Sequence, residues 1–336
     1  MISFGLASPA QAETYRIATY AAPLSRDGPG LLLRDIQRGE DDQIAAIRDV
    51  IARIAPDVLL LTDFDFDHDG LALAGFAVQF DPGYSYHFAL QPNAGVATGL
   101  DLDGNGRLGD ARDAQGYGRF AGDGGLAILS RFPIQAGQAT DLSAVLWKDL
   151  PGAVLPQAAG APFLSNAALD ILRLSSTGHW IVPVSLPDGK PLSVMAFSAT
   201  PPVFDGPEDM NGLRNRDELR LWEAVLDGDF GPVPSQFVIA GNANLDPQAG
   251  DGFSDAMASF LRDPRLQDPL PDQDTADWPD DGPGNLRVSY VLPAADWTVK
   301  DAGVFWPAPD DPDRALLGDD GLAAGPHHLV WVDIAR

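Results

Sequence analysis

The sequence predicts a single mixed α/β (α+β) domain in which strands outnumber helices. Apolar residues make up 45% of the 336-residue chain, which is enough for a sizeable core. The chain has 35 glycines and 29 prolines, a content that favours many turns over long helices. No Ser-, Gly- or Pro-rich linker divides the sequence, so one domain is favoured over two.

The N-terminal half begins with a strand, a helix and a second strand. The runs "YRIATYA" at 15–21 and "DVLLLTDFD" at 57–65 are predicted to be buried strands. Between them, isoleucines recur at spacings of three and four, the stripe of an amphipathic helix that ends at Pro56. Residues 80–125 are rich in Gly, Asp and aromatic residues and predict a loop, after which "GLAILSRFPI" at 125–134 predicts a strand.

The C-terminal half begins with a hairpin around the turn "PDGK". The helix "RNRDELRLWEAVL" follows, with its leucines and tryptophan on one face, and leads to the apolar strand "QFVIAG". A segment dense in Pro and Asp predicts a surface loop before the last two strands. In order, these elements cover residues 179–186, 191–199, 214–226, 236–241, 262–285, 286–293 and 327–335.

Charge and cysteine content exclude several classes of function. The formal net charge is −26, so the chain repels phosphate backbones and a nucleic-acid partner is disfavoured. The absence of cysteine excludes disulfides, zinc–thiolate sites and thiol nucleophiles. No apolar run of membrane-spanning length occurs, and a monomer is expected.

The N-terminal stretch resembles the end of a secretory signal. "AQA" at 10–12 is an A-x-A cleavage pattern that follows small and apolar residues. Residues 1–13 are therefore interpreted as a residual signal-peptide tail, and residues 14–336 as the folded domain. A periplasmic or secreted location follows from this interpretation; the alternative is an ordinary disordered terminus.

The stretch "QFVIAGNANLDP" at 236–247 indicates where a functional site would lie. Its apolar run ends at Gly241, and Asn242, Asn244 and Asp246 follow. Polar side chains at the end of a buried strand are typical of the sites of α/β proteins. Here the first polar group is an amide, which neither accepts a proton nor binds a metal as a carboxylate does.

The strand-end stretches together resemble one family, the endonuclease/exonuclease/phosphatase (deoxyribonuclease-I-like) superfamily, and most strongly a bacterial secreted branch with an Asp/Asn-rich loop. The resemblance implies a four-layered sandwich of two packed mixed β-sheets flanked by helices. The matching stretches, in the family's order, are "RIATYA", "PDVLLLTDFD", "DLDGNGRLGDARDAQGYGRFAG", "LAILSRFPI", "SSTGHWIVPV", "TPPVFDGPEDMNGLRNRDELRLW", "FVIAGNANLDP", "RVSYVLP" and "HHLVWVDI".

The same resemblance implies that most catalytic positions are substituted. The family's asparagine, metal-binding glutamate, tyrosine and phosphate-binding histidine fall at Ala21, Asp63, Gly124 and Ser198. Its G-D-x-N aspartate and asparagine, the aspartate of its R-x-D-Y strand and its final Asp-His pair fall at Asn242, Asn244, Ser289, Pro326 and His327. Asn244, His327 and Asp63 are therefore expected to be the remnants of the catalytic site.

Two functions follow from this pattern. The first is an inactive or impaired pseudo-hydrolase that acts by binding a small phosphate ligand or a protein partner. The alternative is an active phosphoesterase that uses Mg²⁺ to cleave a small phosphate ester or lipid head group, with a displaced metal site around Asp63, Asp65 and Asn244.

The loop "DLDGNGRLGDARD" at 101–113 is the better candidate for structural Ca²⁺. Asp101, Asp103 and Asn105 stand at positions one, three and five of a calcium loop, and Gly106 supplies the turn. The closing glutamate is replaced by Arg112, so Asp110 or Asp113 is expected to take its place, and the predicted ligand set is Asp101, Asp103, Asn105 and Asp110. The alternative is a surface loop rich in Asx turns.

The run "TDFDFDHDG" at 62–70 is a weaker metal candidate. Asp65, Asp67 and Asp69 have D-x-D-x-D-G spacing, but Phe76 stands where a closing acid would be needed. A solvated acidic loop is the competing interpretation.

Arg214 and Asn215 are candidates to bind substrate at the mouth of the site, and so is His179, which matches the family. The structural alternatives are a helix N-terminus with its caps and a half-buried His-Trp packing pair.

Overall fold

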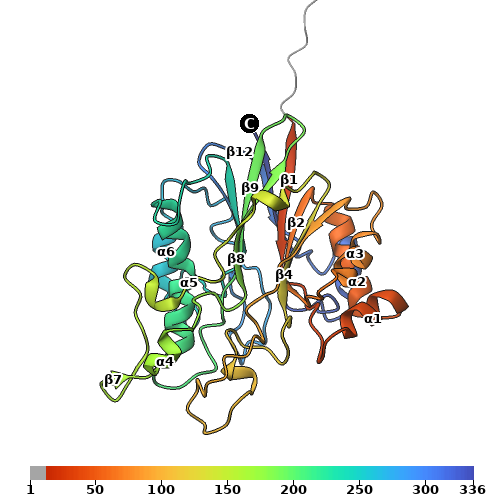
Figure 1. The fold of residues 1–336 in the computed structure, drawn as a ribbon. Coiled ribbons are helices and arrows are strands. Elements are labelled where there is room, and N and C mark those ends of the chain that lie inside the picture. The colour runs from red at the N-terminus through yellow and green to blue at the C-terminus, as the bar shows by residue number, and fades with distance from the viewer. Residues whose placement is uncertain (1–12) are drawn as a thin grey trace, which may run out of the picture.

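Two mixed β-sheets pack face to face, and helices cover both outer faces (Figure 1). The structure is a computed structural model that describes residues 13–336. The predicted α/β sandwich is confirmed. The predicted signal-peptide tail lies, apart from Glu13, outside the described residues.

The first sheet has six strands in the order β12-β13-β1-β2-β4-β3. β1 and β2 run parallel to each other, whereas the other neighbours are antiparallel. In sequence order the strands are β1 (Thr14–Tyr20), β2 (Val58–Phe64), β3 (Tyr86–Phe88), β4 (Gly125–Ser130), β12 (Thr298–Val304) and β13 (Val330–Ala335).

The second sheet has five strands in the order β11-β10-β9-β8-β5. Its parallel pair is β9 and β10, and the predicted hairpin is the antiparallel pair of β8 and β9. The strands are β5 (Thr140–Asp141), β8 (Gly178–Ser185), β9 (Pro191–Ser198), β10 (Phe237–Asn242) and β11 (Ser289–Pro293), and a separate small hairpin consists of β6 (Gln157–Ala158) and β7 (Ala161–Pro162).

The helices divide between the two outer faces. Figure 1 places α1–α3 outside the six-stranded sheet and α4–α6 outside the other. Sequence patterns predicted α2 and α5 but not the shorter helices. The bounds are α1 (Leu31–Arg38), α2 (Asp42–Ile54), α3 (Leu71–Ala77), α4 (Asn166–Leu169), α5 (Met210–Leu226) and α6 (Ser254–Phe260).

The central strands are apolar along their whole length because both of their faces are buried. Ile17 and Leu60 belong to the core between the sheets, whereas Ala18, Leu59 and Leu61 belong to the core beneath α1–α3. A strand covered on both sides has no solvent face, so it shows no polar alternation. This explains the uninterrupted apolar runs that made β1 and β2 recognisable.

Among residues 13–336, no helix combines the length and the apolar character that crossing a membrane requires.

The burial of β10 gives a test of the fold. Ile239 is fully buried, so Ile239→Ala should lower the free energy of unfolding by about 2–5 kcal/mol through lost transfer energy and the cavity left behind. Val78 is 77% exposed, and Val78→Ala should change the same quantity by less than about 0.5 kcal/mol. Chemical denaturation measures both; similar small changes in the two variants would contradict the buried position of β10.

Candidate functional site

At one edge of the second sheet, β9 and β10 end and β11 begins in a row of uncharged polar side chains. Asn242 at the end of β10 is in register with Ser198 of β9 and Ser289 of β11. All three side chains are buried, and Ser289 Oγ has no hydrogen-bond partner among the described residues. The row therefore offers hydroxyl and amide groups but no carboxylate.

Asn242 and Asn244 are bound to each other. Asn242 Nδ2 donates to Asn244 Oδ1 over 3.1 Å, and the Asn244 backbone N–H donates to Asn242 Oδ1 over 3.2 Å. Asn244 Nδ2 donates to the Ala199 carbonyl over 2.8 Å. Asn244 has φ 50°, a left-handed conformation that asparagine tolerates better than most residues. This amide pair ties the end of β10 to the chain that follows β9.

Asp63 lies near the end of β2 and is half-buried. Burial raises the pKa of its carboxyl group to about 7, and the nearby Asp65 and Asp123 carboxylates act in the same direction. A Cβ atom at Gly124 would lie 2.8 Å from Asp63 Oδ1, and Gly124 itself has a left-handed φ of 56°. The glycine thus provides the space that the Asp63 side chain occupies.

In the acidic run after β2, Asp65 and Asp67 accept hydrogen bonds from backbone N–H groups. Asp65 is buried and accepts from the backbone N–H groups of Arg26 (2.9 Å) and Gly124 (3.1 Å), and burial raises its pKa to about 6. The two oxygens of Asp67 accept from backbone N–H groups in the first turn of α3. The aspartates of this run therefore anchor the loop and begin a helix.

His327 lies against an aromatic ring. Its imidazole makes an edge contact with Trp278, with ring centroids 5.1 Å apart. Burial lowers its pKa to about 4, so the ring is neutral at pH 7. His327 Nδ1 has no hydrogen-bond partner within residues 13–336, so no carboxylate orients the ring.

His179, Arg214 and Asn215 lie in the scaffold beneath the strand ends and are all buried. Arg214 donates to the backbone carbonyls of 115 and 173–175, and His179 contacts the Ser175 hydroxyl at 2.8 Å. Asn215 Nδ2 donates to the carbonyls of 200 and 243, each over 2.7 Å. These contacts fit the structural interpretation; that the three groups bind substrate stays a prediction.

Glu218 on α5 was missed by the sequence analysis. It is fully buried and accepts from the backbone N–H groups of Ser176 (2.6 Å) and Thr200 (2.7 Å) and from the Ser176 hydroxyl (2.7 Å). Burial raises its pKa to about 7, although the nearby Arg214 acts in the opposite direction. Glu218 therefore joins α5 to two loops, one of which follows β9.

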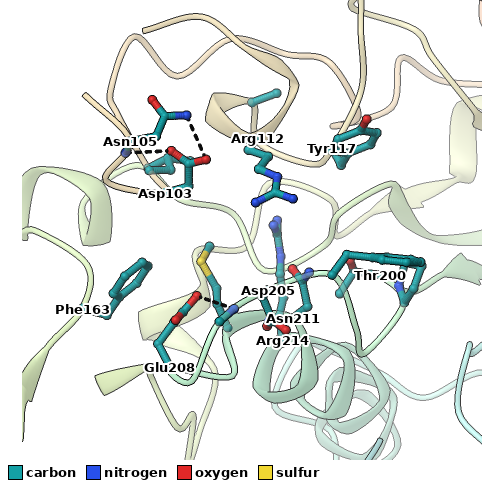
Figure 2. Close-up of a pocket in the computed structure, with 16 residues that line it drawn as sticks. Asp103, Asn105, Arg112, Tyr117, Phe163, Thr200, Asp205, Glu208, Asn211 and Arg214 are labelled. Carbon is teal, nitrogen blue, oxygen red and sulfur yellow. Dashed lines mark hydrogen bonds between the residues drawn. The ribbon is translucent and has the colours of Figure 1, made fainter. Parts of the chain in front are cut away.

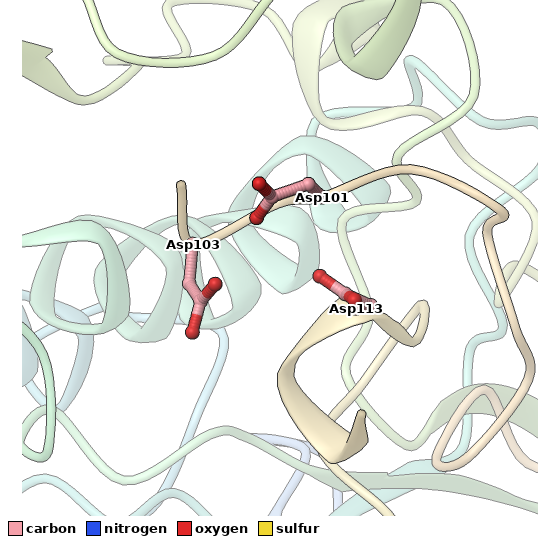
Figure 3. Close-up of side chains that lie close together, drawn as sticks. All are labelled: Asp101, Asp103 and Asp113. Carbon is pink, nitrogen blue, oxygen red and sulfur yellow. The ribbon is translucent and has the colours of Figure 1, made fainter. Parts of the chain in front are cut away.

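The Asp-rich loop brings Asp101, Asp103 and Asp113 together (Figure 3), and one ligand atom from each lies within 4.8 Å of the others. The favoured closing residue, Asp110, instead accepts from Asn105 Nδ2 over 2.8 Å. Asp113 is buried and accepts from the Leu102 and Gly109 backbone N–H groups. Among residues 13–336, these three aspartates are the acidic side chains whose oxygens lie close enough together to share a metal ion.

A cavity of about 950 Å³ lies between this loop and the segment that precedes α5 (Figure 2). It is lined in part by Asp103, Arg112, Tyr117, Phe204 and Arg214. Neither Asp63 nor the Asn242–Asn244 pair lines it, so it is separate from the strand-end row.

A family model described as "Endonuclease/Exonuclease/phosphatase family" matches residues 35–325. This chain belongs to that family. A search of the curated proteins found no significant match.

Solved structures of the endonuclease/exonuclease/phosphatase fold cover 96% of this chain. An endonuclease/exonuclease/phosphatase from Beutenbergia cavernae DSM 12333 has 19% identity, a TM-score of 0.58 and 71% of its own chain covered. A family protein from Leptotrichia buccalis C-1013-b has 14% identity, a TM-score of 0.54 and 100% coverage. Sphingomyelinase C from Streptomyces griseocarneus has 17% identity, a TM-score of 0.51 and 100% coverage. At these identities the likeness shows the fold.

The strand-end residues do not fit the Mg²⁺ ion that the family resemblance implies. Mg²⁺ requires hard, anionic oxygen ligands in octahedral geometry. At this edge Asn242 and Asn244 supply neutral amides that already bind each other, and Ser198 and Ser289 supply hydroxyls. Asp63 is the carboxylate that remains at the family positions, and its raised pKa weakens it as a ligand near neutral pH.

The raised pKa of Asp63 predicts how stability depends on pH. The folded-state pKa of about 7 lies above the ordinary aspartate value of 3.8, so the folded protein retains this proton over that range while the unfolded chain loses it. Relative to Asp63→Asn, the free energy of unfolding of the wild type should fall as the pH rises through that window.

Denaturation at a series of pH values measures this difference. Asp229→Asn, at an exposed aspartate, is the matched control and should run parallel to the wild type. An Asp63→Asn curve that also runs parallel to the wild type would contradict the raised pKa.

Proposed function

We propose that this family member carries a degraded phosphoesterase site and acts by binding rather than by hydrolysis. The observation that carries the proposal is the amide pair: Asn242 and Asn244 are bound to each other at the end of β10. Neither amide is ionised, so the pair supplies no charge to a divalent cation and no base to a water molecule.

His327 supports the same proposal. In a hydrolytic site a carboxylate would orient the imidazole and stabilise its protonated form. Here burial lowers the pKa of His327, and its neighbour is the ring of Trp278. Loss of an acid–base partner costs on the order of 10²–10⁴ in rate, so hydrolysis should be nearly abolished.

The ligand of such a protein would be a small phosphate compound or a protein partner. The net charge of −26 disfavours nucleic acid. A periplasmic or secreted, monomeric protein remains our proposal; the location is based on the cleavage pattern at 10–12.

A second candidate is an active phosphoesterase with a rearranged site. The observation that favours it is the raised pKa of Asp63, about 7, which burial causes first and the nearby Asp65 and Asp123 carboxylates add to. A carboxyl group with that pKa is suited to act as a general base near neutral pH. In this candidate Asp63, Asp65 and Asn244 would hold Mg²⁺, which would stabilise the charge that develops on the phosphate.

We also propose that the 101–113 loop holds a structural Ca²⁺ ion. Asp101, Asp103 and Asp113 bring three carboxylates together, an arrangement that is repulsive without a cation. The loop offers few apolar side chains to bury, so a cation would supply order that packing does not. In this proposal Asp113 replaces Asp110 as the third carboxylate ligand. Asn105 Nδ2 donates hydrogen bonds to Asp103 and Asp110 and so holds the loop in shape around the ion.

Turnover separates the two candidate functions. Purified protein should not hydrolyse bis- or mono-nitrophenyl phosphate with Mg²⁺, Mn²⁺ or Ca²⁺, and Asn242→Asp should not restore activity, because the other catalytic groups are still missing. The rearranged active site would be supported instead if the wild type turned over at ordinary enzyme rates and Asn244→Ala abolished that activity.

Calcium binding is tested by thermal unfolding. Millimolar Ca²⁺ should raise the Tm, because a ligand at one hundred times its Kd stabilises the folded state by about 2.7 kcal/mol. The double variant Asp101→Ala plus Asp103→Ala should lose this rise. The exposed pair Asp280→Ala plus Asp281→Ala is the control and should keep it; an equal response of both variants would exclude the loop.

A further inference from the structure

The cavity between the Asp-rich loop and the segment before α5 is lined by two guanidinium groups and by apolar side chains. The apolar side chains include Leu102, Phe163, Pro201 and Met210. At about 950 Å³ it is large enough for a small organic molecule. Its polar groups decide what kind of molecule it fits.

The carboxylates around the cavity are already engaged. Asp205 accepts from the backbone N–H of Asn211, and Glu208 accepts from the backbone N–H of Gly206 over 3.1 Å. Asp103 accepts from the backbone and side-chain nitrogens of Asn105 (Figure 2). These negative charges are bound to their own loops, which leaves them less available to a cationic ligand.

The two guanidinium groups are not satisfied in the same way. Arg112 is exposed, and its guanidinium makes no hydrogen bond or ion pair with any residue from 13 to 336. Arg214 is 95% buried, and its Nε and Nη2 donate to carbonyls while Nη1 has no partner in the described chain. Figure 2 shows the two side chains pointing toward one another. An anion between them could accept hydrogen bonds from the Arg112 guanidinium and from Arg214 Nη1.

Two exposed aromatic rings flank these cations. Tyr117 is 64% exposed and Phe204 is 76% exposed, and both line the cavity. Phe204 has φ 72°, a left-handed conformation that is strained for a residue other than glycine. An exposed ring held in a strained conformation beside a cavity is suited to contact a bound molecule.

We propose that this cavity binds a small organic anion, with its charged group between Arg112 and Arg214 and its apolar body against Phe163, Tyr117 and Phe204. The site is independent of the strand ends, because it needs neither a metal nor the Asn242–Asn244 pair. Phosphonate, phosphate and carboxylate groups can all pair with a guanidinium group, and the first two have a third oxygen that can reach the second guanidinium.

Binding is tested with phenylphosphonate, which carries a ring and a charged group but no bond that a phosphoesterase cleaves. Calorimetry in Ca²⁺ without Mg²⁺ or Mn²⁺ keeps the ion proposed for the 101–113 loop, which carries Arg112, and benzoate serves as the carboxylate arm. Wild-type protein should bind phenylphosphonate more tightly than benzoate. Methylphosphonate, which lacks the ring, should bind more weakly than phenylphosphonate.

Single substitutions then test whether the ligand binds in this cavity. Arg112→Gln should weaken phenylphosphonate binding about tenfold, the loss expected for a charge-assisted hydrogen bond. Arg107→Gln removes the same charge from an exposed position on the same loop and should change the affinity less than about twofold. Phe204→Ala should also weaken binding.

Absence of binding by both ring-bearing probes at millimolar concentration would overturn the proposal. Equal losses in Arg112→Gln and Arg107→Gln would overturn it too, because they would indicate a general charge effect. Neither result depends on hydrolysis, so the proposal fails or stands separately from the degraded-site proposal.

Discussion

The arrangement of this protein depends on two parallel strand pairs that are buried between helices and a facing sheet. β1 and β2 form one pair, and β9 and β10 form the other. β9 and β10 are parallel neighbours, so they end at the same edge of their sheet, and the residues that follow them lie side by side. At that edge Asn242 is in register with Ser198 and Ser289, and apolar packing holds these strands in place whatever polar groups stand at their ends.

Buried polar groups behind that edge join α5 to the loops around it. Glu218, Arg214 and Asn215 make hydrogen bonds to backbone in the loops after β9 and β10 and before β8. A buried polar group that loses its partner costs about 1–3 kcal/mol. Substitution of these residues would thus destabilise the fold.

Sequence patterns predicted the strands with continuous apolar runs and the two long helices, since each carries a periodic signal. They missed α1, which follows Gly30 without a side-chain cap, and β12, whose residues are mostly exposed or half-buried. They favoured Asp110 over Asp113, because spacing does not reveal the short helical turn at 111–113 that turns Asp113 inward. The cavity of Arg112 and Arg214 joins distant segments, so no local motif predicts it.

We propose that divalent-ion chemistry belongs to the 101–113 loop and not to the strand ends. Paramagnetic Mn²⁺ tests this directly, because it broadens the NMR signals of nuclei near its binding site. With substoichiometric Mn²⁺ and isotope-labelled protein, the amide signals around Asp101, Asp103 and Asp113 should broaden first, while those of Asn242, Asn244 and Asp63 persist. Broadening that begins at the latter three residues would contradict the account and indicate a working metal site at the strand ends.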